Sequence, residues 1–226
     1  MGGSYSVSLR FRERERRPDW DARKLEIANY VAGCIYYNNF DRCIETLYWN
    51  AQAFAAGSKI ADNFLDDNQI YLKERKKPGT DTVKFFEIGC GEAYGTGSFI
   101  SNNIVGGLTE KYPDIDFEFH LGEEYNGEVG DDVTICVDGR LYGGSYYLVY
   151  DPWVFEDPEL IEELNQPWLD DGKEPPYTTE EAYYAQEKFQ RPEPTEENPY
   201  PIPKAYPSNS CFAGPMEWYC DLFQDE

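Results

Sequence analysis

The chain has 226 residues, and 43 Asp and Glu against 20 Lys and Arg give it a net charge of −23 at neutral pH. This charge disfavours direct binding to nucleic-acid phosphates or to anionic membranes, because both need a positive protein surface. We therefore expect the binding partner to be a basic protein, and neither nucleic acid nor a membrane.

Six cysteines are spread along the chain without a CxxC pair or a Cys/His metal spacing. They indicate small buried thiols in a reducing compartment, and they predict no metal site. No run of 18 apolar residues occurs, and segment 1–17 contains no apolar stretch long enough for a signal peptide. We expect a cytoplasmic protein of a bacterial host.

The first half of the chain predicts a strand and then helices. Apolar residues at every second position of 6–14 have the period of a half-exposed strand. Steps of three and four residues between apolar side chains predict a helical region over 21–56, with a break at 38–39, that covers a sheet. A polar loop containing KERKKPGTD (73–81) follows.

The next 70 residues predict one helix among several strands. The expected elements are a strand at 83–90, a helix at 98–111, and strands at 114–122, 132–139 and 144–151. Pro113 ends the helix, because the residue before a proline is pushed out of the helical region.

Strand 114–122 has one apolar and one polar face. Its apolar set predicts contact with helices, and its polar set predicts a face in water, on which His120, the only histidine, is exposed. The apolar set is Ile115, Phe117, Phe119 and Leu121, and the polar set is Asp114, Asp116, Glu118 and His120.

The segment LTEKYPDIDFEFHLGEEYNGEVG (108–130) resembles a ferredoxin-like α+β domain of phage and plasmid proteins of unknown function. In that domain a helix ending in L-x-x-x-[FY]-P leads into an alternating strand, an acidic turn and a glycine. The matching residues are Leu108, Tyr112, Pro113, Phe117, Phe119, Glu123, Glu124 and Gly130. WNA at 49–51 adds to the likeness. The resemblance implies a mobile-element origin and no known catalytic residues. The expected fold is α+β, a ferredoxin-like antiparallel sheet covered by helices on one face.

Composition changes near residue 150, which divides the chain into a ferredoxin-like domain (1–150) and an acidic, extended C-terminal arm (151–226). The arm holds 12 of the 15 prolines and 19 acidic against four basic residues. Proline at this density prevents long helices and central strands. The arm is also rich in aromatic residues, which disordered chains lack. We expect it to pack on its own domain or on a partner, with short helices near 156–165 and 178–189.

The stretch KFFEIGCGEAYGTG (84–97) raises an enzymatic alternative. Its glycines resemble the turn with which class I methyltransferases hold S-adenosylmethionine, here over residues 87–93. Glu123, the candidate ribose ligand, lies 36 residues after Glu87, where such loops place a carboxylate after about 20. The preferred interpretation is a core strand whose glycines lead into the next helix, in a protein that is not an enzyme and binds no cofactor.

Acidic runs interleaved with aromatic residues carry the main functional hypothesis. Carboxylates held rigidly on a surface can occupy a groove built for the phosphates of DNA or RNA. The chain is therefore expected to bind and inhibit a basic, nucleic-acid-handling host protein, such as a defence nuclease. The candidate phosphate surrogates are Glu123, Glu124, Asp131 and Asp132 between two strands, and Glu162, Glu163, Asp170, Asp171, Glu180 and Glu181 in the arm.

Overall fold

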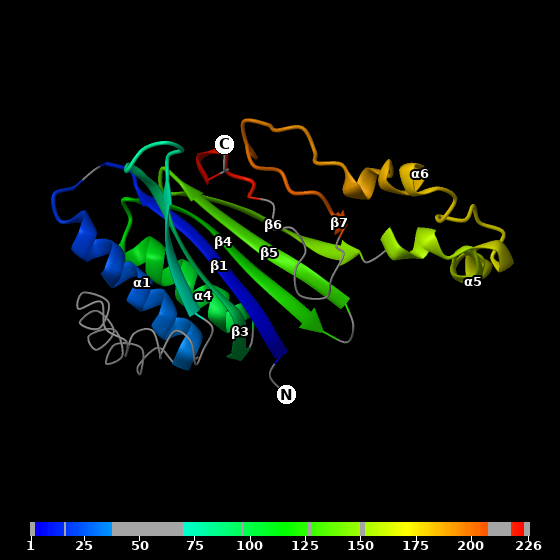
Figure 1. Ribbon diagram of the computed structural model, residues 1–226, viewed down its shortest axis with the longest axis horizontal. Coiled ribbons are helices and arrows are strands. Elements are labelled where there is room, and N and C mark those ends of the chain that lie inside the picture. Colours follow the sequence, from blue (N-terminus) through cyan, green and yellow to red (C-terminus); the bar gives the residue numbers. More distant parts are fainter. Residues whose placement is uncertain are drawn as a thin grey trace.

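Seven strands form one sheet in the order β2-β3-β1-β4-β5-β6-β7 (Figure 1). The computed structural model describes residues 3–15, 17–37, 70–95, 97–125, 128–149, 152–207 and 218–223. The strands are β1 (Gly3–Glu13), β2 (Ile70–Lys76), β3 (Val83–Gly95), β4 (Ile115–Tyr125), β5 (Glu128–Val137), β6 (Arg140–Val149) and β7 (Ala205–Pro207). Neighbours are antiparallel except β6 and β7, which are parallel. The predicted α+β class with a largely antiparallel sheet is confirmed.

Helices α1 (Trp20–Tyr37) and α4 (Gly97–Lys111) pack on the same face of the sheet (Figure 1). The apolar set of β4 points into this core together with alternate residues of β1, as the two-residue period requires. Helix α4 confirms the helix expected at 98–111. Of the helical region expected over 21–56, α1 covers the first part, and residues 38–56, with the expected break and the WNA motif, lie outside the described residues.

The second face of the sheet was expected to lie in water, and this expectation is wrong. Residues 200–206 and the C-terminal segment, which we define as residues 218–223, cover it with a second apolar cluster. Asp116, Glu118 and His120 are consequently buried, as is Arg10 in the strand predicted to be half exposed. Local periodicity could not indicate a cover that lies about 100 residues further along the chain.

The glycine-rich stretch and the segment before it also differ from expectation. Strand β3 continues to Gly95, and Ala93 pairs with Tyr5 of β1, so residues 87–93 lie inside a strand and not in a turn. The methyltransferase alternative loses its geometric basis, because its cofactor turn must join a strand end to a helix. Residues 73–76, expected in a polar loop, belong to the edge strand β2, where charged side chains are common.

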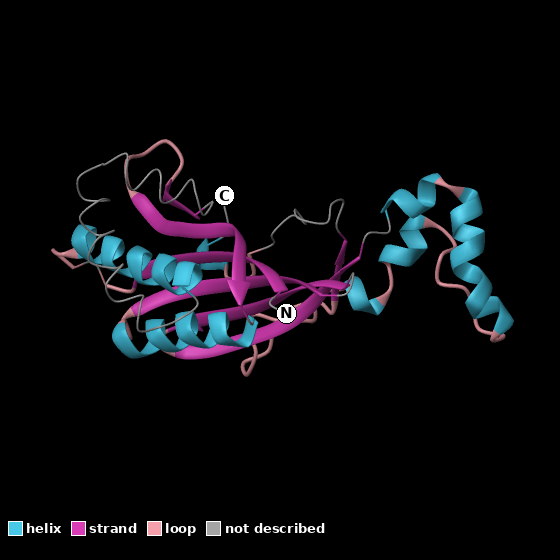
Figure 2. Cartoon of the chain, turned by 90° about the horizontal axis from the view of Figure 1, so that it is seen from below, coloured by secondary structure: helices cyan, strands magenta, loops and turns pink. Residues whose placement is uncertain are grey.

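After β6 the chain leaves the sheet and forms a small helical lobe, which we define as residues 152–190. The lobe contains η1 (Pro152–Glu156), α5 (Pro158–Asp170), α6 (Glu180–Tyr184) and η2 (Glu187–Phe189). It projects beyond the end of the sheet (Figure 2). The chain then returns through residues 191–204, and β7 pairs with β6.

Candidate functional site

The helical lobe is held together by caps and by a cluster of aromatic rings. Asp157 caps α5 by accepting hydrogen bonds from the amides of Glu159 and Leu160, at 3.0 and 3.4 Å. The buried Asn165 side chain donates to the Tyr177 carbonyl oxygen at 2.6 Å and accepts from the Tyr177 amide at 3.0 Å. These bonds tie α5 to the chain that leads into α6.

The aromatic cluster of the lobe centres on Tyr183, which is buried. Its ring stacks on Tyr177 with centroids 5.0 Å apart, and it meets Phe155 at 5.6 Å and Phe189 at 5.1 Å. Offset and edge-to-face contacts of this kind stabilise small cores beyond their buried area. The dense aromatic residues of this region therefore build a core within the lobe itself.

One face of α5 carries a row of carboxylates. Glu159, Glu163 and Asp170 are spaced by four and seven residues, so helical geometry places them on one side, and all are exposed. The amide of Gln166 lies in the same row and donates to Asp170 at 2.6 Å. Asn165 lies on the opposite, buried side. Of the predicted residues on α5, Glu163 belongs to this row, and Glu162 is exposed beside it.

The tip of α5 combines acidic and apolar exposed side chains. Trp168 and Leu169 are 44% and 50% exposed, directly before the exposed pair Asp170 and Asp171. Lys173 forms an ion pair with Asp171 at 2.9 Å and lies 5.8 Å from the centroid of the Trp168 ring. Exposed large apolar side chains beside charges are typical of binding surfaces.

Glu180 and Glu181 occupy the first turn of α6. Thr179 caps this helix through its hydroxyl, which accepts from the Ala182 amide at 3.1 Å. Both glutamates are exposed, and acidic residues at this end interact favourably with the helix dipole. Six of the ten predicted residues therefore lie exposed in the lobe.

The other four predicted residues lie on β4 and β5. Glu123 and Glu124 belong to β4 and not to a turn, and they pair with Gly130 and Val129 across the hairpin. Asp131 and Asp132 are consecutive in β5, so their side chains point to opposite faces of the sheet. This group is not one continuous surface.

Asp131 is only partly exposed, with 15% of its side chain accessible, so it is less available to a partner than the carboxylates of the lobe. The Tyr146 hydroxyl donates to its Oδ2 at 2.5 Å, and a Cβ added at Gly122, in the strand beside it, would lie 2.7 Å from its Oδ1. Asp132 is exposed and accepts from the Ser145 hydroxyl.

A buried polar cluster, which the sequence did not predict, lies between the second face of the sheet and the C-terminal segment. Glu118 accepts hydrogen bonds from the amides of Tyr219 and Cys220, at 2.8 Å each and one on each oxygen. Arg10 forms an ion pair with Glu87 at 3.0 Å and donates to the Phe223 carbonyl oxygen. The cluster thus holds the C-terminal segment by its backbone, through two amides that donate to Glu118 and one carbonyl oxygen that accepts from Arg10.

Trp218 packs against two members of this cluster. Its ring lies 4.1 Å from the guanidinium carbon of Arg10 and 4.6 Å, edge to face, from the ring of His120. His120 is 1% exposed, so its predicted exposure is wrong. The sequence does place charged residues, Arg10 and Glu118, inside two alternating strands, and it has aromatic residues at 218–223. Nothing in the sequence connects these features, because they meet only in the folded chain.

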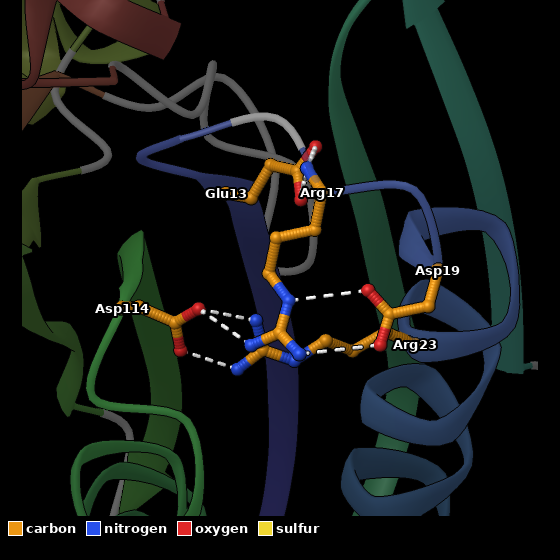
Figure 3. A network of polar contacts seen from close by, with 5 residues as sticks. All are labelled: Glu13, Arg17, Asp19, Arg23 and Asp114. Atoms are coloured by element: carbon orange, nitrogen blue, oxygen red, sulfur yellow. Dashed lines mark hydrogen bonds and ion pairs between the residues drawn. The ribbon is translucent and has the colours of Figure 1, made fainter.

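Beyond the C-terminal end of β1, a network of charges joins the strand to α1 (Figure 3). Arg17 binds Asp19 at 3.1 Å and Asp114 at 3.4 Å, and its amide donates to Glu13. Arg23 binds Asp114 through two nitrogens. These hydrogen bonds, that of Arg23 above all, lower the pKa of Asp114 to about 2. The arginines of this end are thus engaged within the molecule.

Among the described residues, no three His, Cys, Asp or Glu side chains are arranged so that they could hold a metal ion. Within the same ranges no helix is long and apolar enough to cross a membrane.

Comparisons of the chain with protein-family models, with curated proteins and with solved structures found no match. The functional argument therefore depends on the geometry of the chain itself.

Proposed function

We propose that this chain is an acidic inhibitor that binds a basic, nucleic-acid-handling protein of a bacterial host through the helical lobe. The observation that carries the proposal is the ordered row of exposed carboxylates on α5, in a lobe that projects from the sheet. Between residues 152 and 190 the sequence has eleven acidic and two basic residues. Both lysines are engaged inside the lobe, Lys173 with Asp171 and Lys188 with the Tyr183 hydroxyl.

Order in the lobe matters for affinity. A flexible acidic tail loses conformational freedom when it binds, which reduces the binding free energy. In the lobe, the Asp157 cap, the Asn165 bonds and the Tyr183 cluster fix the backbone before any encounter. A preorganised surface avoids much of that loss. This supports a recognition element over a tail that only keeps the protein in solution.

The tip adds an apolar anchor to the charges. Tryptophan is enriched among the residues that dominate binding energy at protein interfaces, and Trp168 lies exposed beside Asp170 and Asp171. We infer that the partner presents an apolar pocket bordered by Lys or Arg side chains. A surface of that composition fits a groove that normally holds bases and phosphates.

For the fold, we propose a ferredoxin-like unit made of β1, α1, β2, β3, α4 and β4. The order β2-β3-β1-β4 with antiparallel neighbours, and two helices on one face, support this proposal. The resemblance of residues 108–130 to a phage and plasmid domain supports the proposed mobile-element origin.

The test is capture of proteins from a bacterial lysate at low salt by the immobilised full chain. The variant Glu163→Gln/Asp170→Asn/Asp171→Asn should retain less than about a tenth of the wild-type capture, because each rigid charge pair contributes on the order of 0.5–1 kcal/mol. The captured protein should also be released by added duplex DNA or RNA, which compete for the same groove.

The matched control is Glu193→Gln/Glu196→Gln/Glu197→Gln, which removes three exposed charges from the returning segment and leaves the lobe unchanged. Its capture should equal that of the wild type within a factor of two to three. Equal losses in both variants would mean that only net charge matters. Capture insensitive to nucleic acid would contradict phosphate mimicry.

A further inference from the structure

The buried cluster holds the C-terminal segment at a point where several charges are removed from water. Arg10 and Arg75 both form ion pairs with Glu87, whereas Glu118 and Asp131 lie on either side of the His120 ring. An uncompensated charge in a closed environment strongly destabilises a structure. A second proton on the imidazole of His120 would offset the charges of the two carboxylates beside it.

The geometry of the imidazole favours that second proton. Its Nε2 lies 2.8 Å from Oε1 of Glu118, a hydrogen bond in which the ring nitrogen donates. Its Nδ1 faces Oδ2 of Asp131 at 3.9 Å and has no hydrogen-bond partner among the described residues. In the neutral ring, the Nδ1 lone pair would point toward a carboxylate oxygen, which is repulsive, whereas an N–H there is attracted to it.

Every element around the ring contributes a charged or titratable group. Burial disfavours the imidazolium, but Asp131 and Glu118 outweigh it, so the pKa of His120 is raised above its ordinary value. The surrounding groups are Arg10 on β1, Glu87 on β3, Glu118 on β4, Asp131 on β5, Tyr146 on β6, and Tyr219 and Cys220 in the C-terminal segment.

The same carboxylate connects the ring to the segment. Oε1 of Glu118 accepts from both His120 and the Tyr219 amide, and Oε2 accepts from the Cys220 amide. Loss of the Nδ1 proton would keep the Nε2 hydrogen bond to Glu118 but would remove the positive charge that lies between Glu118 and Asp131, so the two carboxylates would repel each other and the hold of Glu118 on the segment would weaken. The edge-to-face contact between His120 and Trp218 would change at the same time.

We propose that the imidazole of His120 holds the C-terminal segment on the sheet while both of its nitrogens carry a proton. The segment is released as Nδ1 loses its proton. Because the group is more basic when folded, its contribution is fully present below the unfolded pKa of about 6.5 and is lost as pH rises through the folded pKa. The segment therefore loosens on the alkaline side of neutrality.

The test uses the full chain, in which His120 gives the only histidine NMR signal. Its ring carbon and proton shifts are followed from pH 5 to 9, together with the exchange protection of the Tyr219 and Cys220 amides. We expect a midpoint above about 6.5. Protection should fall across this midpoint, by a factor of ten for each unit by which the measured midpoint exceeds the unfolded value.

Two variants with the same change of charge sharpen the test. Asp131→Asn keeps an acceptor for Tyr146 but removes the charge that faces Nδ1, so the midpoint should fall by about one unit. Asp132→Asn, the next residue on the opposite face, should leave the midpoint unchanged.

His120→Gln keeps a donor for Glu118 but cannot be charged, so the two amides should show low protection at all pH values. A midpoint at or below 6.5 in the wild type, equal shifts in the two aspartate variants, or protection that ignores the titration of the histidine would each overturn the proposal.

Discussion

Gly107 lies in α4 against the ring of Tyr30 in α1. A Cβ at this position would lie 1.7 Å from the Tyr30 hydroxyl oxygen, which donates to the Asn103 carbonyl oxygen at 2.7 Å. Tyr30 is buried in the core, so it has little room to move aside. The glycine therefore allows the two helices to pack closely on the sheet.

We predict that Gly107→Ala lowers the free energy of unfolding by about 1–3 kcal/mol, through overpacking against Tyr30. The neighbour Gly106 supplies the control, because nothing lies within 4 Å of a Cβ there. Gly106→Ala should instead stabilise by about 0.5–1 kcal/mol, as alanine does in a helix interior. Urea denaturation of both variants measures these changes in the free energy of unfolding. Equal effects at the two positions would contradict the packing argument.

The position of α5 within the lobe depends on the amide side chain of Asn165. Asn165 bridges α5 and the residue Tyr177 with two hydrogen bonds, and its neighbour Gln166 is exposed. Because the aromatic cluster and the acidic row both depend on the position of α5, loss of this bridge should loosen the lobe while the sheet stays intact.

Asn165→Ala should destabilise the lobe by about 1–3 kcal/mol, since it leaves two backbone groups of Tyr177 without these partners. Limited proteolysis should then cut within the lobe, and amide exchange in β4 should stay slow. Gln166→Ala is the matched control and should behave as the wild type. Unfolding of the sheet together with the lobe would contradict the idea that the lobe carries its own core.

The sequence predicted those elements whose apolar residues recur with a regular period. It did not predict which residues are buried by a segment far along the chain. The alternation of β4 and the proline after α4 located both elements to within a few residues. Strand β2 was missed because its charged side chains are typical of loops as well as of edge strands. The candidate carboxylates of the lobe were predicted from composition. Their support by Asn165, the burial of His120 and the partial enclosure of Asp131 depend on contacts that local sequence patterns do not show.

Across the whole molecule, the lobe combines eleven acidic with only two basic residues, while arginines near the β1–α1 turn bind neighbouring carboxylates (Figure 3). The lobe is thus the end that a basic protein would approach under electrostatic attraction. Long-range attraction speeds encounter, and close apolar packing slows dissociation. The two contributions come from different side chains and can be separated.

For the protein captured by the lobe, we predict that the association rate falls steeply with salt in the wild type. It should start lower and depend less on salt in Glu163→Gln/Asp170→Asn/Asp171→Asn. Trp168→Ala should keep the salt dependence of association and raise the dissociation rate about tenfold or more, as loss of an aromatic anchor costs about 2 kcal/mol. Surface plasmon resonance at several ionic strengths measures both rates. An unchanged dissociation rate in Trp168→Ala would mean that charge alone holds the partner, and would remove the apolar pocket from the proposed interface.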